Sequence, residues 1–383
     1  MKLTNKKIKW NHYINYCVIG AVLIVFTILS LAGGTKSSTE YLLEKLAISI
    51  TLAVSLSIVV GFLGELSLGH AGFMCVGAYI GGKIASVLDP GADNPLVLIM
   101  TLFVGGAVAA VFGFIIGLPA LRLKGDYLAI VTLAFGEIVR SIFLNTSSES
   151  FGGALGLRTP RYDSGTLFIY AFLVVLLCLF VTQNIIRSKH GRAITSIRDN
   201  EIAARATGIN VTKYKLIAFM VSAFFAGVAG VLHSHANFTV QSTMFDYNYS
   251  IEILVMVVLG GMGSINGSII AASLITFLNV KLATILTGDL AVLKDLIYAL
   301  ILIVIVIYNN APALKAFREK YNIKALWRKL IRHTDEPSAV RDDEGEWARV
   351  PTKIDMDEVL SLDVYVTESV VAPDKPKDSQ GGK

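Results

Sequence analysis

Three polar side chains that could carry chemistry stand close together inside an otherwise apolar stretch: Glu65, Ser67 and His70. A carboxylate and an imidazole this close in sequence could form a pair or pass a proton, and pairing is the simpler interpretation. A charged group within an apolar run is costly unless it faces water or a partner. These residues therefore mark either a structural pair or a polar path through apolar surroundings.

Glu137 and Arg140 form a second polar group, three residues apart in a stretch with helical character. This spacing favours an ion pair on one helix face, and a place on a solute path is the alternative. No residues have the spacing of a catalytic triad or a zinc site, and the three cysteines, Cys17, Cys75 and Cys178, all lie in apolar runs. We therefore expect no enzyme activity and no metal site in this chain.

One motif suggests nucleotide binding but does not support it. Residues 77–83 have the glycine and lysine spacing of a phosphate-binding loop, but Ile84 stands where that loop needs Ser or Thr. The segment also lies in an apolar run rather than between a strand and a helix. We expect the chain to bind no cofactor, so any ATP that drives it must be bound by another polypeptide.

Glycines punctuate two apolar segments, residues 59–82 and 257–274. Each glycine inside a helix costs roughly 1 kcal/mol relative to alanine. Paired glycine-interrupted segments in the two halves of a chain point to the translocation site of a transporter, although close helix packing is an equal alternative. The candidate pathway residues are Gly64, Glu65, Ser67, Gly69, His70, Glu137, Gly260, Gly261, Gly263 and Ser264.

The composition predicts the fold class that must position these residues. Of the 383 residues, 54% are hydrophobic and only 16% are charged, whereas about one-quarter of a typical soluble domain is charged. A bilayer core takes about 20 helical residues to cross, and we expect about ten such spans in an all-α, polytopic membrane protein with glycine-broken helices. The expected spans are 14–32, 46–63, 68–88, 96–118, 127–145, 166–185, 216–235, 249–263, 267–287 and 292–308.

Basic residues predict the orientation. Residues 187–215 carry seven Lys or Arg against two acids, and loops 89–95 and 236–248 carry no Lys or Arg. Because cytoplasmic loops are enriched in Lys and Arg, we place both termini in the cytoplasm. The expected organisation is a cytoplasmic N-terminus (1–13), a transmembrane domain (14–312) with a loop at 186–215, a basic juxtamembrane segment (313–333) and an acidic, disordered tail (334–383).

Five motifs in order resemble the LivM-type permease subunit of branched-chain amino-acid ABC importers. They are residues 64–79, 121–140, 151–157, 187–215 and 258–272. The resemblance implies an ABC importer permease fold in the bacterial cytoplasmic membrane. It also implies a LivH-type permease partner, two cytoplasmic ATP-binding subunits and an extracytoplasmic substrate-binding protein, with membrane lipid around the chain and no nucleic acid.

In this resemblance the loop at 186–215 corresponds to the segment that docks into the ATPase. The coupling residues that match are Gly191, Arg192, Arg198, Glu201, Ala203, Ala204 and Gly208, and Asp199 lies among them. Three departures from the family are present. Glu65 stands where Gln is frequent, residues 308–315 lack the usual pattern after the last span, and the tail beyond about residue 320 matches nothing in the family.

Two alternatives to an amino-acid ABC permease remain at the level of sequence. One is a secondary transporter that uses an ion gradient through Glu65 and His70, and the other is an ABC permease for a different substrate such as urea or a sugar. A membrane scaffold without transport is a third interpretation, which leaves the paired glycine segments without a role.

Overall fold

The computed structural model describes residues 14–31, 37–92, 94–123, 125–285, 300 and 303, and these are mainly helical. The helices are α1 (Ile14–Leu31), α2 (Ser37–Ser57), α3 (His70–Leu88), α4 (Pro95–Ala120), α5 (Asp126–Asn145), α6 (Ser148–Phe151), α7 (Ser164–Arg187), α8 (Lys189–Asp199), α9 (Glu201–Ala206), α10 (Val211–Ala236), α11 (Tyr247–Gly260) and α12 (Ile265–Ile285). Two short strands, β1 (Leu157–Arg158) and β2 (Thr239–Val240), pair with each other. The predicted helical class is confirmed.

Seven helices in the described ranges are long and apolar enough to cross a membrane. They overlap the predicted spans between residues 46 and 287, except the one at 249–263, so the predicted count of about ten is not confirmed. That segment forms α11, which has 14 residues and is about 21 Å long, short of the roughly 30 Å of a bilayer core. The predicted span at 292–308 falls outside the described ranges except for residues 300 and 303, and the segments 1–13, 313–333 and 334–383 fall outside them entirely.

The first of these spans begins earlier than predicted. It runs over Ser38–Leu63 rather than from residue 46, because the helix includes two charged residues, Glu44 and Lys45, that a hydropathy pattern excludes. Glu44 is fully buried. The helix therefore continues through charged residues that pack among neighbouring helices.

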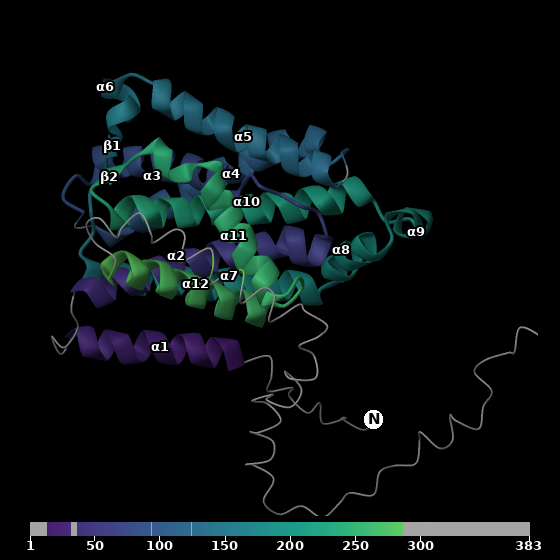
Figure 1. Cartoon of the computed structure of the whole chain (residues 1–383), viewed down its shortest axis with the longest axis horizontal. Helices are drawn as coiled ribbons and strands as arrows, with labels where there is room; N and C mark the ends of the chain where they lie inside the picture. Colours follow the sequence, from purple (N-terminus) through teal and green to yellow (C-terminus); the bar gives the residue numbers. More distant parts are fainter. Residues whose placement is uncertain are drawn as a thin grey trace, which may run out of the picture. The chain divides into compact units, whose positions relative to one another are not determined.

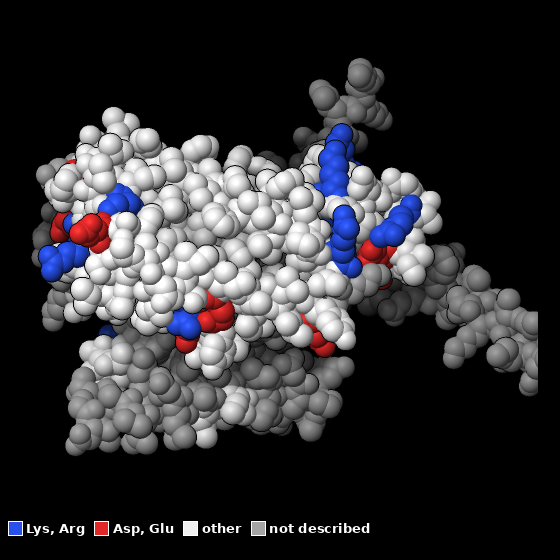
Figure 2. Space-filling view, turned by 90° about the horizontal axis from the view of Figure 1, so that it is seen from above, with Lys and Arg blue, Asp and Glu red and all other residues white. Residues whose placement is uncertain are grey.

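The long helices lie side by side, and the connections gather at their two ends (Figure 1). The loop helices, as we call α8 and α9, lie at one end, whereas α6, β1 and β2 lie at the opposite end. In Figure 2 most charged side chains gather toward the two ends, and the surface between them is largely uncharged apart from one group of opposite charges. This distribution suits a chain whose middle faces lipid and whose ends face water.

Helix α10 occupies the centre of the arrangement and packs against α2, α3 and α4. The approach of α10 to α3 is close because glycines face each other: a Cβ added at Gly77 would lie 2.1 Å from the carbonyl oxygen of Gly227. Small residues at such contacts let helix backbones approach and gain van der Waals contact, which drives helix association where water is absent.

Gly77 lies in the first glycine-punctuated segment, residues 59–82, of which only a part is interrupted. Helix α3 runs without a break from His70 to Leu88. The interruption is confined to residues 64–69, which have no helical structure. The glycines of α3 serve packing, and only those before it serve the break.

The loops at the end opposite the loop helices are tied together. Leu157 pairs with Val240 and Arg158 with Thr239 in an antiparallel ladder. Beyond the ladder, Thr159 donates its backbone N–H to the Phe238 carbonyl (3.1 Å) and its hydroxyl to the Ser234 carbonyl (2.8 Å). These contacts fasten the segment before α7 to the last turn of α10.

Candidate functional site

The first break (residues 64–69) follows a π-helical turn, Ile58–Leu63, at the end of α2. Gly64 ends this turn with φ 77°, a left-handed conformation that glycine adopts without steric cost. Leu68 then donates its backbone N–H to the Thr132 hydroxyl of α5 (3.0 Å). The break is therefore a defined turn held by a neighbouring helix.

The second break (residues 261–264) separates α11 from α12. Gly261 and Gly263 have φ angles of 90° and 83°, which only glycine accommodates easily. Ser264 begins α12 by accepting the backbone N–H of Gly267 on its hydroxyl (3.2 Å). Gly260 and Gly267 pack against each other across this turn, so the alternative of close packing through small residues is confirmed here.

The second break touches the π-helical turn that precedes the first break, although some 200 residues separate them in sequence. A Cβ added at Gly61, in the π-helical turn before the first break, would lie 2.7 Å from the backbone nitrogen of Gly263. Real Cβ atoms essentially never approach so closely. A larger residue at Gly61 would therefore force this turn and the second break apart.

Serine and asparagine caps define the loop helices. Ser188 accepts the N–H of His190 at the start of α8 (3.1 Å), and Asn200 accepts that of Ala203 at the start of α9 (3.0 Å). Such caps satisfy backbone donors that a helix start leaves unpaired. On α8 the apolar face, Ala193, Ile194 and Ile197, is buried. The loop predicted at 186–215 thus contains the helices α8 and α9, between the end of α7 and the start of α10.

Arg198 at the end of α8 contacts both breaks. Its Nη1 donates to the carbonyl oxygen of Gly61 (3.3 Å). A Cβ added at Gly64 would lie 2.6 Å from its Cγ, and one added at Gly263 would lie 3.5 Å from its Nη1. Asp199 accepts from the same guanidinium at Nη2 (3.0 Å). One side chain of a loop helix thus reaches the point where the two breaks meet.

Lys215 provides a second link between the first break and the loop helices. Its Nζ lies 2.5 Å from Glu65 Oε1 and 3.3 Å from Glu201 Oε2 of α9. Lys215 itself belongs to α10 and is 2% exposed. Glu201 also pairs with Arg205 on its own helix (2.9 Å). Because a buried charge must be paired, this lysine holds the break, α9 and α10 in one arrangement. We call the contacts of Arg198 and Lys215 with the breaks the junction.

Lys215 was not among the residues predicted from sequence, where it appeared only as the edge of a basic loop. The signal that could have found it was Glu65 itself, because a carboxylate in an apolar run needs a cationic partner. The prediction that His70 pairs with Glu65 is wrong. His70 Nε2 lies 3.0 Å from the Ser222 hydroxyl and 3.4 Å from that of Ser55, so it joins α2, α3 and α10.

The remaining predicted pathway residues lie partly in the first break and partly on α5. Ser67 and Gly69 are buried within the first break. Glu137 lies elsewhere: it pairs with Arg140 (2.8 Å), as predicted, and accepts the backbone N–H of Tyr247 at the start of α11 (3.1 Å). A carboxylate is favourable at a helix N-terminus, so Glu137 fastens α11 to α5.

The predicted coupling residues face two ways. Ala204 is buried, and Arg198, although exposed, donates to the Gly61 carbonyl. Gly191 must be small because an added Cβ would lie 2.1 Å from the Ile186 carbonyl oxygen. Arg192, Ala203 and Gly208 are exposed. Beside them Ile202, which the sequence did not single out, is 78% exposed. The loop helices therefore present an outer face to the surroundings, while the guanidinium of Arg198 reaches Gly61.

Long apolar helices, two neighbouring breaks and loop helices that contact them define a multi-pass α-helical membrane permease. The chain belongs to the family described as branched-chain amino acid transport system / permease component, which matches residues 38–306. This membership confirms the expectation of a transport component rather than an enzyme.

Named relatives agree with the family. The chain is 39% identical over 260 residues to the high-affinity branched-chain amino acid transport system permease protein LivM of Salmonella typhimurium, covering 60% of each protein. It is 38% identical over 260 residues to LivM of Escherichia coli, again covering 60% of each. The chain thus spans about 60% of the length of these relatives.

A more distant relative is the ribose import permease protein RbsC of Escherichia coli, 24% identical over 314 residues, with 76% of this chain and 92% of RbsC covered. No solved structure matches the chain.

Proposed function

We propose that this chain is the permease subunit of an ATP-driven importer of branched-chain amino acids. The names of the LivM relatives support this substrate class. The observation that carries the coupling part of the proposal is Arg198, a loop-helix residue in contact with both breaks. Movement of α8 is thereby transmitted to the two places where membrane helices are interrupted.

The partner that moves α8 is proposed to be a cytoplasmic ATPase, one of a pair. Its docking surface is the outer face of the loop helices, where Ile202 is 78% exposed. A hollow of about 380 Å³ lies beside Ile202 and is lined also by Arg122 and Arg205. An exposed apolar side chain beside a basic hollow suits an anchor residue within a polar rim.

The end that carries the loop helices is proposed to face the cytoplasm, with both termini on that side. Its loop at 187–215 is strongly basic, whereas the opposite loop at 89–94 has no Lys or Arg. A LivH-type permease would complete the membrane part. A substrate-binding protein would meet the opposite end, where α6, β1 and β2 lie (Figure 1).

The proposed mechanism is alternating access. Closure of the ATPase pair displaces α9 and α8, and Arg198 and Lys215 carry that displacement to the two breaks. Gly64, Ser67, Gly69, Gly261 and Gly263 then act as the hinge that opens or closes the path near the cytoplasmic end. Glycine residues in these breaks allow backbone rotations that a continuous helix does not allow.

An ion-coupled transporter loses its main support. That alternative relied on a carboxylate and an imidazole acting together, whereas Glu65 pairs with Lys215 and His70 lies between Ser55 and Ser222. Ribose remains the substrate to test against, because RbsC is a relative of this chain.

The test uses vesicles that contain the full chain with the proposed partner subunits, binding protein and ATP, and measures uptake of labelled leucine and ribose. We expect leucine uptake that requires ATP. Ile202→Glu should reduce co-purification of the ATPase by about tenfold or more, as for a central interface residue.

The matched control is Leu155→Glu, which alters a residue 77% exposed near the opposite end. It should leave ATPase co-purification unchanged. Leucine uptake without ATP, or ATPase binding that survives Ile202→Glu, would contradict the proposal.

A further inference from the structure

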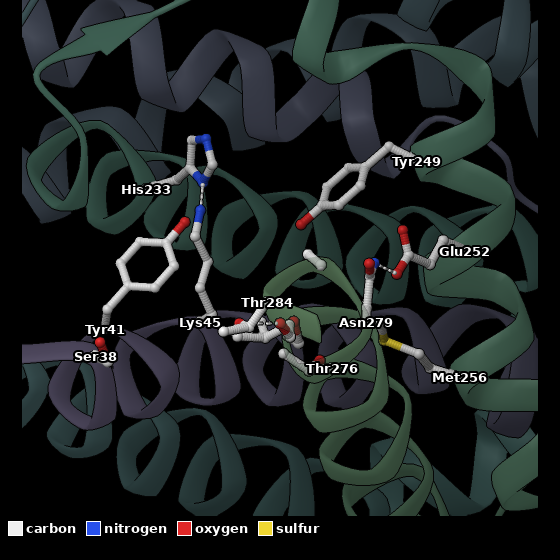
Figure 3. Close-up of a pocket in the computed structure, with 13 residues that line it drawn as sticks. Ser38, Tyr41, Lys45, His233, Tyr249, Glu252, Met256, Thr276, Asn279 and Thr284 are labelled. Atoms are coloured by element: carbon white, nitrogen blue, oxygen red, sulfur yellow. Dashed lines mark hydrogen bonds between the residues drawn. The ribbon is translucent and has the colours of Figure 1, made fainter. Parts of the chain in front are cut away.

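A cavity of about 620 Å³ lies between α2, α10, α11 and α12. It is separate from the junction, because its lining residues do not include those of the two breaks or the loop helices. Its volume falls in the range of roughly 300–1,000 Å³ that small-molecule sites occupy. Figure 3 shows the lining side chains, which come from four helices.

One side of the cavity is cationic. Lys45 of α2 places its Nζ 3.2 Å from His233 Nδ1 of α10, and Tyr41 lies beside it (Figure 3). Because an ammonium group has only donors, Nδ1 is the acceptor and the ring proton is on Nε2. Glu44, the residue before Lys45, is fully buried and does not line the cavity.

The opposite side is anionic. Glu252 of α11 accepts a hydrogen bond on Oε1 from Asn279 Nδ2 of α12 (3.0 Å). Figure 3 places this pair across the cavity from Lys45 and His233. Met256 lies next to it, and Val280 also lines the cavity. The cavity therefore offers a cation and a carboxylate on facing sides with apolar surface available.

Two buried polar atoms of the lining have no hydrogen-bond partner in the described part of the chain: His233 Nε2 and Thr276 Oγ1. Their residues are 8% and 6% exposed. Leaving such atoms unpaired costs free energy. Because both atoms are themselves inaccessible, the charged groups that the cavity offers remain those of Lys45 and Glu252.

We propose that this cavity binds a free aliphatic α-amino acid as a zwitterion. Lys45 receives the α-carboxylate, Glu252 receives the α-ammonium group, and Met256 and Val280 contact the aliphatic side chain. The inference rests on the proposed function and specifies where the transported molecule is held within this chain.

Charge complementarity selects the zwitterion over other small solutes. An amino acid satisfies the cation and the carboxylate together and brings no net charge. A ligand with only an anionic group leaves Glu252 without a new partner, and one with only a cationic group does the same to Lys45. Desolvating a charge without a partner is costly, so both are discriminated against.

The experiment measures binding at the permease itself. The full chain, assembled with its proposed partner permease and ATPases in lipid nanodiscs without binding protein or nucleotide, is titrated by saturation-transfer NMR. The three probes are L-leucine, L-leucinamide, which lacks the carboxylate, and 4-methylpentanoate, which lacks the ammonium group. We expect leucine to bind more tightly than either analogue.

Two variants remove one charge each. Lys45→Met should weaken leucine binding by about tenfold or more and leave leucinamide binding unchanged, because leucinamide has no carboxylate to lose. Glu252→Gln should weaken leucine similarly and leave 4-methylpentanoate unchanged. Lys45→Arg, which keeps the charge, should retain the preference for leucine over leucinamide.

Lys281→Met serves as the control, because Lys281 is exposed on α12 and lies outside the lining. It should bind all three probes as the wild type does. Equal weakening of leucine and its analogues by Lys45→Met and Glu252→Gln, or no weakening by either, would overturn the assignment of this cavity.

Leucine uptake by the wild-type assembly, measured in parallel with binding protein and ATP, separates the two levels of inference. If the assembly imports leucine but Lys45→Met and Glu252→Gln do not weaken leucine binding, the assignment of the cavity is refuted and the proposed function is retained. An assembly that hydrolyses ATP but imports no amino acid refutes the proposed function and, with it, this assignment.

Discussion

Lys215 Nζ of α10 lies 2.5 Å from Glu65 Oε1 of the first break, and the lysine is 2% exposed. The pair connects a helix that runs through the centre of the protein to a segment where another helix is interrupted. Since Glu201 of α9 shares the same ammonium group at 3.3 Å, one cation holds three parts of the chain.

Lys215→Met should lower the free energy of unfolding by about 3–5 kcal/mol, because it leaves the mostly buried carboxylate of Glu65 without its cation. Adding Glu65→Gln should recover much of this loss, since the unpaired charge is then removed. Unfolding can be followed with a thiol-reactive fluorescent dye, because Cys75 and Cys178 are free and buried.

Lys281→Met is the control for that comparison, because it removes an exposed lysine of α12. Its unfolding temperature should match that of the wild type. A double variant no more stable than Lys215→Met alone would show that the loss is one of packing rather than of charge pairing.

Arg198→Ala should reduce transport without releasing the ATPase. The guanidinium reaches inward to the Gly61 carbonyl (3.3 Å), so its loss removes contact with the breaks and leaves the outer face of the loop helices intact. We expect leucine uptake to fall by about tenfold or more, in the range of typical coupling free energies. ATPase co-purification should remain at the wild-type amount.

Lys281→Met serves again as the control, because Lys281 is an exposed lysine of α12 and lies outside the loop helices. Uptake by this variant should stay closer to that of the wild type. Loss of ATPase binding in Arg198→Ala would instead place this residue at the docking surface.

Gly61→Ala should separate the second break from the turn before the first. The added Cβ would lie 2.7 Å from a backbone nitrogen at Gly263, and a backbone cannot rotate away as a side chain does. Overpacking of this kind costs about 1–3 kcal/mol. Hydrogen exchange should become faster at the amides of residues 261–264.

Gly20→Ala in α1 introduces the same methyl group where nothing lies within 4 Å. It should change neither the unfolding temperature nor exchange at residues 261–264. Identical behaviour of the two variants would mean that the contact between Gly61 and Gly263 is dispensable.

Sequence patterns located the two glycine-interrupted segments and the loop between α7 and α10 because the causes are local. Glycine at Gly64 and Gly263 permits positive φ, and the basic residues of the loop distinguish it from the apolar runs on either side. The contact between Gly61 and Gly263 could not be read in this way. It depends on how α2 and α12 pack, and no local preference of either glycine encodes it.

The roles of charged residues were the harder part to predict. Lys215 resembled the end of a basic loop, and Glu44 and Lys45 resembled a loop before a span. In each case the helix continues and a distant element supplies a partner, as Glu65 does for Lys215 and His233 for Lys45. A hydropathy pattern assigns charges to the outside and misses those that packing brings inside.

The fastening between the segment before α7 and the last turn of α10 has a mechanical consequence. Helix α10 has 26 residues and is therefore about 39 Å long. Because Thr159 and the β1–β2 ladder anchor its far end, a push delivered at Lys215 acts on a rod with a fixed fulcrum. A tilt of only about 5° about that fulcrum would sweep the Lys215 end through about 3 Å on a rod of this length.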